Sequence, residues 1–282
     1  MINDKESVDH YRVAVCQFEA IPLEVNRNLA KIEELTNRAA AAGANLVVHP
    51  ECCVTGMPVS GDLAKKIVGL SEVAFGKDKG HTILQLEQMA SACNVHVLVG
   101  MPEKVDGRVY NSALHIHPQK GTISAFHKVH MWPGNEEFFA AGDSYQVQAG
   151  PKGLFAPIIC FDLEFPEASR AAALLGAQLI AVPMANMEPF QEFQRTYARC
   201  RAIENSVYMA VSNLIGENQG DFYFGGSIIV DPFGNVLAEA GRSEAVLVAD
   251  VDLQMIEKAS EDTKYLKLRR PDTYSGLIQT TE

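Results

Sequence analysis

Three reactive side chains in this sequence each follow a short run of apolar or β-forming residues. They are those of Glu51, Lys128 and Cys160. If the three runs are strands ending at one edge of a fold, these side chains meet where α/β enzymes place their reactive groups. A helix that begins near Pro166 would direct its amino terminus toward the thiol and favour a thiolate. The three runs are residues 46–49, 122–126 and 156–159.

A carboxylate, an ammonium and a thiol at one site are sufficient for acyl transfer. The thiolate is the attacking species and no histidine stands beside Cys160, so Glu51 is the candidate for accepting the thiol proton. Lys128 and the backbone N–H of Phe161 are the candidates for stabilising the oxyanion that forms on attack. The pattern therefore predicts acyl transfer through a cysteine.

The elements that position these residues alternate between strands and helices, which predicts an α/β fold with sheets covered by helices. Apolar residues at three- and four-residue steps from Val25 to Ala39 predict an amphipathic helix. The turn DPFGN at residues 231–235 predicts a hairpin between strands at 227–230 and 244–251. Further strands are predicted at residues 12–18, 95–101, 110–117, 178–182 and 207–212, and further helices at 82–92, 167–175 and 190–204.

Composition excludes several classes of function. The 24 basic and 35 acidic residues give a net charge of −11, which argues against nucleic-acid and anionic-membrane surfaces. No apolar run approaches the roughly 20 residues of a membrane span. The six cysteines form no Cys-x-x-Cys pair, so neither a zinc ribbon nor a disulfide framework is indicated, and a reduced cytoplasmic setting is expected. Glycine turns at residues 216–220 and 225–226 lack both phosphate-binding spacings.

The domain organisation expected from the chain is simple. Residues 1–11 are polar, lack the apolar segment of a secretory signal and are expected to form a flexible lead. Residues 12–282 show no repeat, no low-complexity segment and no linker, so a single domain is predicted. Its tail, from about residue 253, begins helical and becomes basic at residues 264–270.

The sequence resembles the nitrilase superfamily of carbon–nitrogen hydrolases from about residue 12 to the tail. Three motifs in order carry the resemblance: VVHPE around Glu51, FHKVH around Lys128, and ICFDLEFPE around Cys160. Further matching segments are YNSA, PMANM, RCRAIEN and GSIIVDPFG, at residues 110–113, 183–187, 199–205 and 226–234.

This resemblance implies a four-layer α-β-β-α sandwich and a triad of Glu51, Lys128 and Cys160. It implies that the thiolate attacks an amide carbonyl, ammonia leaves, and water activated by Glu51 hydrolyses the thioester. Neither a metal nor an organic cofactor is needed. The resemblance also implies a homodimer or a higher homo-oligomer, formed through the helices that follow Pro166 and Phe190.

The sequence departs from the family at a second glutamate that usually follows the lysine motif and contacts both the lysine and the substrate. An alignment without a gap from Lys128 to Gly142 places Asn135 there. A one-residue shift, which the preceding Pro-Gly pair would permit, brings Glu136 to the position. We expect Glu136 to occupy it, with Asn135 and Glu137 as alternatives.

The substrate is expected to be a small primary amide, aliphatic or ω-amino. Asp162 and Leu163 stand where branches that bind an α-carboxylate tend to carry arginine, which disfavours carbamoyl amino acids. Glu164 and Glu188 favour a cationic amine. The alternatives are an N-carbamoyl amine hydrolase, a nitrilase, or a non-catalytic member that serves as a binding partner. Candidate substrate-binding residues are Phe161, Trp132, Asn186 and Glu188.

Overall fold

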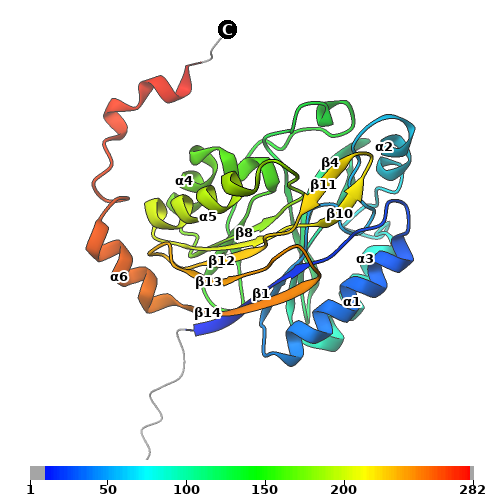
Figure 1. Cartoon of the computed structure of the whole chain (residues 1–282), viewed down its shortest axis with the longest axis horizontal. Coiled ribbons are helices and arrows are strands. Elements are labelled where there is room, and N and C mark those ends of the chain that lie inside the picture. Colours follow the sequence, from blue (N-terminus) through cyan, green and yellow to red (C-terminus); the bar gives the residue numbers. More distant parts are fainter. Residues whose placement is uncertain (1–9, 280–282) are drawn as a thin grey trace, which may run out of the picture.

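Two six-stranded sheets pack face to face, and helices cover the outer face of each, in a computed structural model that describes residues 10–279 (Figure 1). The four-layer sandwich predicted from the sequence is thereby confirmed. The first sheet has the order β14 (Ala245–Asp252), β1 (His10–Gln17), β2 (Leu46–Val48), β3 (His96–Val105), β4 (Arg108–His117), β5 (Gly121–His127). The second has the order β13 (Val236–Glu239), β12 (Ile228–Val230), β9 (Tyr208–Ser212), β8 (Leu179–Pro183), β7 (Leu154–Pro157), β6 (Gln148–Ala149).

Alternation along the strands builds the layers, because successive side chains of a strand point to opposite faces. In β1, Val13 and Val15 face the core between the two sheets, whereas Ala14 and Cys16 face the outer helices. The same alternation in β8 sends Leu179 to the core between the sheets and its neighbour toward the helices that cover the second sheet. Strands buried on both faces explain the almost continuous apolar runs of the sequence.

Helices α1 (Val25–Ala41) and α3 (His81–Cys93) cover the first sheet, and α4 (Pro166–Leu174) and α5 (Gln191–Asn205) cover the second (Figure 1). The predicted amphipathic helix is α1, whose buried stripe includes Ile32 and Leu35. The remaining α-helices within residues 10–279 are α2 (Gly61–Val68) and α6 (Leu253–Thr263), which begins the tail as expected.

Strand direction explains how distant residues reach one edge. Strands β1, β2 and β3 are parallel, and β5 runs in the same direction because two antiparallel steps separate it from β3. Strands β7, β8 and β9 are parallel in the second sheet. The loops that leave the carboxyl ends of β2, β5, β7 and β8 carry the motif residues.

One predicted hairpin is wrong. The turn at residues 231–235 joins β12 to β13, whereas the predicted second strand is β14, which pairs with β1 in the other sheet. The sequence prediction also lacked the hairpin β10 (Ile215–Asn218) and β11 (Asp221–Phe224), which Figure 1 places beside the sandwich. The other predicted strands and helices are present, with ends shifted by a few residues. Most of the flexible lead predicted over residues 1–11 lies outside the described residues. No helix within residues 10–279 is long and apolar enough to cross a membrane.

Candidate active site

Glu51, Lys128 and Asn111 meet in the interior of the fold. Lys128 Nζ lies 2.7 Å from Glu51 Oε1, and Asn111 Nδ2 donates to the same oxygen at 2.7 Å. All three residues are fully buried. The second carboxylate oxygen, Glu51 Oε2, is buried and has no hydrogen-bond partner. One oxygen of this carboxylate is therefore committed to positioning, and the other is available.

The backbone around Glu51 is held by close packing on β3. Its N–H donates to the carbonyl of Met184 at 3.3 Å, which ties it to the loop after β8. Gly100 of β3 passes directly beneath it, and a Cβ at position 100 would lie 2.7 Å from Glu51 Cα and 2.5 Å from Pro50 O. The approach of the two backbones thus requires glycine at position 100.

The strand before Cys160 ends earlier than the run at residues 156–159 predicted. Strand β7 ends at Pro157, and Cys160 is the first residue of a short 3₁₀ helix, η2 (Cys160–Glu164). Its φ of 47° is in the left-handed region, which non-glycine residues enter at a cost and mostly at functional sites.

The surroundings of the thiol favour its protonated form. Burial and then the charge of Glu51 raise the pKa of Cys160, while Lys128 and a hydrogen bond from the backbone N–H of Ala185 oppose that rise. The expected thiolate, stabilised by a helix dipole, is therefore wrong for the unliganded site. The thiol needs a base at the moment of attack.

Lys128 keeps its charge in this interior. Burial alone would lower the pKa of Lys128, but the negative charge of Glu51 and the hydrogen bond that Lys128 donates to it outweigh burial and raise that pKa. A buried ammonium paired with a carboxylate is a fixed positive charge, of the kind that stabilises a developing oxyanion.

Asp162 connects the segment after β5, which begins with Lys128, to the segment after β7 that contains Cys160. Its Oδ1 accepts from the backbone N–H of His130 at 2.8 Å and lies 2.9 Å from His130 Nδ1. Its Oδ2 accepts from the N–H of Ile159 at 3.1 Å. Asp162 is fully buried and positions the backbone at both places. That carbamoyl amino acids are disfavoured stays a prediction, because it rests on the absence of arginine just after Cys160.

A cavity of about 370 Å³ opens beside Cys160 and Lys128, a size suited to a small ligand. Trp132 forms part of its wall and meets Phe161 edge to face, with ring centroids 5.1 Å apart. The four residues predicted to bind substrate, Phe161, Trp132, Asn186 and Glu188, all line this cavity. The other lining residues are Met57, Pro58, Val59, Pro133, Asn135, Glu164, Ala185, Met187, Phe190, Asp221 and Tyr223.

The structure does not bring Glu136 to the cavity. Its side chain is exposed and accepts a hydrogen bond from the N–H of Gly134 at 2.8 Å. Glu137 is exposed as well, whereas Asn135 is buried and lines the cavity. The turn at Gly134, where φ is 95°, admits the gap-free register, so the expected shift to Glu136 is corrected in favour of Asn135.

Three residues of the site were missed from the sequence as functional candidates. Asn111 belongs to a matching segment but was given no role, although its amide holds Glu51. Asp221 and Tyr223 come from β11, where three consecutive aromatic residues follow Asp221.

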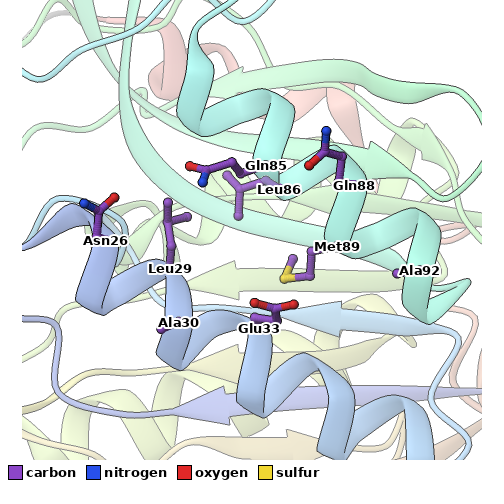
Figure 2. Close-up of a pocket in the computed structure, with 9 residues that line it drawn as sticks. All are labelled: Asn26, Leu29, Ala30, Glu33, Gln85, Leu86, Gln88, Met89 and Ala92. Carbon is purple, nitrogen blue, oxygen red and sulfur yellow. The ribbon is translucent and has the colours of Figure 1, made fainter.

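A second hollow lies between α1 and α3 on the outer face of the first sheet (Figure 2). It measures about 510 Å³, and side chains of the two helices, among them Asn26, Leu29 and Met89, face it. None of its lining residues lines the cavity of Cys160. Its larger size does not make it the reactive site, because its wall offers no nucleophile and no fixed positive charge.

Metal ligands are a separate question. No cluster of three or more His, Cys, Asp or Glu side chains that could hold a metal ion is found within residues 10–279. A reaction without metal or cofactor stays a prediction.

Comparison with known proteins gives a consistent set of relatives. The family model of carbon-nitrogen hydrolases matches residues 12–261. An (R)-stereoselective amidase of Pseudomonas sp. is 36% identical over 231 residues, which cover 82% of this chain and 81% of that protein. An omega-amidase of Xenopus tropicalis is 30% identical and covers 94% of this chain and 97% of its own length.

Among solved structures, an amidase from Nesterenkonia sp. is 26% identical, with a TM-score of 0.83, covering 96% of this chain and 97% of that chain. A variant of that amidase shows Michael addition of acrylamide at its active-site cysteine.

Proposed function

The chain belongs to the carbon-nitrogen hydrolase family, and we propose that it hydrolyses a small primary amide, aliphatic or ω-amino, to the acid and ammonia through a thioester on Cys160. It is a hydrolase of carbon–nitrogen bonds, and its amidase and omega-amidase relatives support amides as the substrates. The observation that carries the proposal is that the two oxygens of the Glu51 carboxylate differ in their contacts. Glu51 Oε1 binds Lys128 and Asn111, while Oε2 has no partner.

In the first half of the proposed reaction, Cys160 Sγ attacks the amide carbonyl carbon as Glu51 Oε2 accepts the thiol proton. Lys128 and the N–H of Phe161 bind the oxyanion, since the first N–H groups of a helix such as η2 have no partner within the helix. Glu51 then returns the proton to the amide nitrogen. The carbon–nitrogen bond breaks, ammonia leaves, and the acyl group stays on the thiol.

In the second half, water takes the place of ammonia. Glu51 accepts a proton from the water as its oxygen attacks the thioester carbonyl, and the oxyanion forms again between Lys128 and Phe161. The carbon–sulfur bond breaks, the carboxylic acid leaves, and Glu51 returns the proton to Cys160. One group thus serves twice as base and twice as acid.

A substrate panel tests this proposal. Ammonia release is measured for primary amides, ω-amino amides, N-carbamoyl amines and nitriles, with the wild type and Cys160→Ala. We expect release from the small amides by the wild type alone. Preferential turnover of carbamoyl amines or nitriles would instead favour those substrates. No release from any compound would support the non-catalytic reading, and activity of Cys160→Ala would refute the mechanism.

Self-association through α4 and α5 stays a prediction. Exposed apolar side chains lie on both helices and at the end of α4: Leu174, Leu175 just after α4, and Phe193, with 50%, 49% and 48% of their surface accessible. Sedimentation equilibrium of the full chain tests it, since a monomer at all concentrations would contradict the prediction.

A further inference from the structure

The wall of the Cys160 cavity contains two carboxylates without a cation partner. Glu164 and Asp221 both line the cavity, and neither lies within ion-pair distance of a lysine, arginine or histidine among residues 10–279. The third carboxylate of the wall, Glu188, is paired with Arg242 at 2.5 Å. Lys128 is the one cationic side chain of the lining, and it binds Glu51.

Strand β11 directs Asp221 into the cavity. Residues two apart in a strand share a face, so Asp221 and Tyr223 point one way while Phe222 points to solvent, where 56% of it is exposed. Asp221, Tyr223 and Cys160 line the same cavity, and Tyr223 is buried. The N–H of Glu188 donates to the carbonyl of Phe222 at 2.9 Å, which fixes β11 against the loop after β8.

Asn135 adds an independent sign of a missing donor. This residue lines the same cavity, is 5% exposed, and has a side-chain carbonyl oxygen without a hydrogen-bond partner. A buried acceptor that lacks a donor is costly and rare in folded proteins. The residues that line the cavity thus include two carboxylates without a cation partner and one buried carbonyl oxygen without a donor.

The chemistry of these acceptors selects the complementary ligand. Loss of water raises the pKa of Asp221, and likewise that of Glu164, where Lys128 and Arg201 oppose the rise. A protonated primary amine supplies three N–H donors, no acceptor and a positive charge. It would compensate the desolvation of Asp221 and Glu164, whereas a carboxylate on the substrate would be repelled by them.

Building on the proposed amide hydrolysis, we propose that the preferred substrate is a short amide whose acyl part ends in a protonated amine, bound by Asp221 and Glu164. This inference names the half of the substrate that is not cleaved. It assigns a specificity role to Asp221, which was not among the candidate residues chosen from the sequence.

An isosteric pair of substrates tests the inference. 3-Aminopropanamide carries an ammonium where butanamide carries a methyl group, and the two are otherwise alike in length. For the wild type, we expect kcat/KM for 3-aminopropanamide to exceed that for butanamide by about tenfold or more, the range of one charged hydrogen bond. Equal values, or a preference for butanamide, would overturn the inference while leaving the amidase proposal intact.

Variants of the two cavity carboxylates test whether these residues cause the preference for the protonated amine. Asp221→Asn and Glu164→Gln should each lower the ratio of the two kcat/KM values several-fold, and the ratio does not depend on the fraction of folded enzyme. Glu217→Gln removes the same charge from exposed β10, outside the cavity, and should keep the wild-type ratio. An unchanged ratio in both cavity variants would also overturn the inference. Absence of ammonia release from both substrates would instead count against the proposed function.

Discussion

Lys128 Nζ lies 2.7 Å from Glu51 Oε1 in a fully buried site, while the second carboxylate oxygen, Glu51 Oε2, has no hydrogen-bond partner. The relationship keeps the lysine charged and fixes the carboxylate, with Asn111 as a second donor to the same atom. A carboxylate held in this way loses little freedom when its other oxygen takes a proton. In the proposed reaction, Glu51 therefore transfers the proton and Lys128 stabilises the oxyanion.

The position of Glu51 depends on the absence of a side chain at Gly100. In Gly100→Ala, a Cβ would lie 2.5–2.7 Å from the backbone of residues 50–52 and must displace that loop. We expect kcat for butanamide to fall by about a hundredfold, since a shift on the order of 1 Å has this effect on a catalytic group. Gly241→Ala is the control, because nothing lies within 4 Å of its Cβ. Full activity of Gly100→Ala would contradict the account.

Removal of the Asp162 carboxylate should loosen two loops together. Asp162→Ala leaves the N–H groups of His130 and Ile159 without their acceptor. We expect the free energy of unfolding in urea to fall by about 3 kcal/mol, the cost of unsatisfied buried donors that had bound a charged group. Asp143→Ala, at an exposed position in the loop before β6, is the comparison. A loss of unfolding free energy below about 0.5 kcal/mol, the level of ordinary surface changes, would show that Asp162 does not hold the two segments together.

The residue after Gly134 that acts on the substrate should be Asn135. In Asn135→Ala the cavity loses its unpaired carbonyl, and we expect kcat/KM to fall about tenfold, the value of one hydrogen bond to a bound substrate. Glu136→Gln should retain activity within about twofold, because its side chain is exposed and binds Gly134. A larger loss in Glu136→Gln than in Asn135→Ala would restore the register expected from the sequence.

Buried histidines should make the fold sensitive to acid. Burial lowers the pKa of His49 and of His115 to about 3, and that of His96 to about 4. Each is neutral when folded but takes up a proton below about pH 6.5 when unfolded. Stability conferred by the neutral form is present above pH 6.5 and is lost as the pH falls toward 4.

Urea unfolding at a series of pH values measures this effect. Each buried histidine should contribute about 1 kcal/mol per pH unit between pH 6 and pH 5. His115→Gln should reduce the slope by that amount, and His81→Gln, at an exposed position of α3, is the surface control. A slope unchanged by His115→Gln would contradict a neutral His115 in the folded protein.

Sequence patterns were sufficient for the residues that follow strands. Glu51, Lys128 and Cys160 each come after an apolar or β-forming run, and parallel topology brings such strand ends together. The position after Gly134 was not predictable, because one left-handed glycine decides which of three consecutive side chains turns inward. Asp221 was missed because β11 reaches the cavity from a hairpin about 60 residues beyond Cys160, and only the tertiary fold brings the two together.

The protonation state of the Cys160 thiol could not be predicted from local sequence either. Local sequence placed Cys160 before a helix and thereby suggested a thiolate, but burial and the nearby charge of Glu51 reverse that expectation. Both causes are tertiary, since Glu51 arrives from the other sheet.

Trapping the acyl-enzyme tests the central claim most directly. The enzyme is mixed with butanamide, quenched in acid during turnover, and its intact mass and peptides are measured. The account predicts a mass increase of one butanoyl group on the peptide that contains Cys160, and no such adduct in Cys160→Ala. Ammonia release without any adduct, accompanied by retained activity of Cys160→Ala, would contradict it.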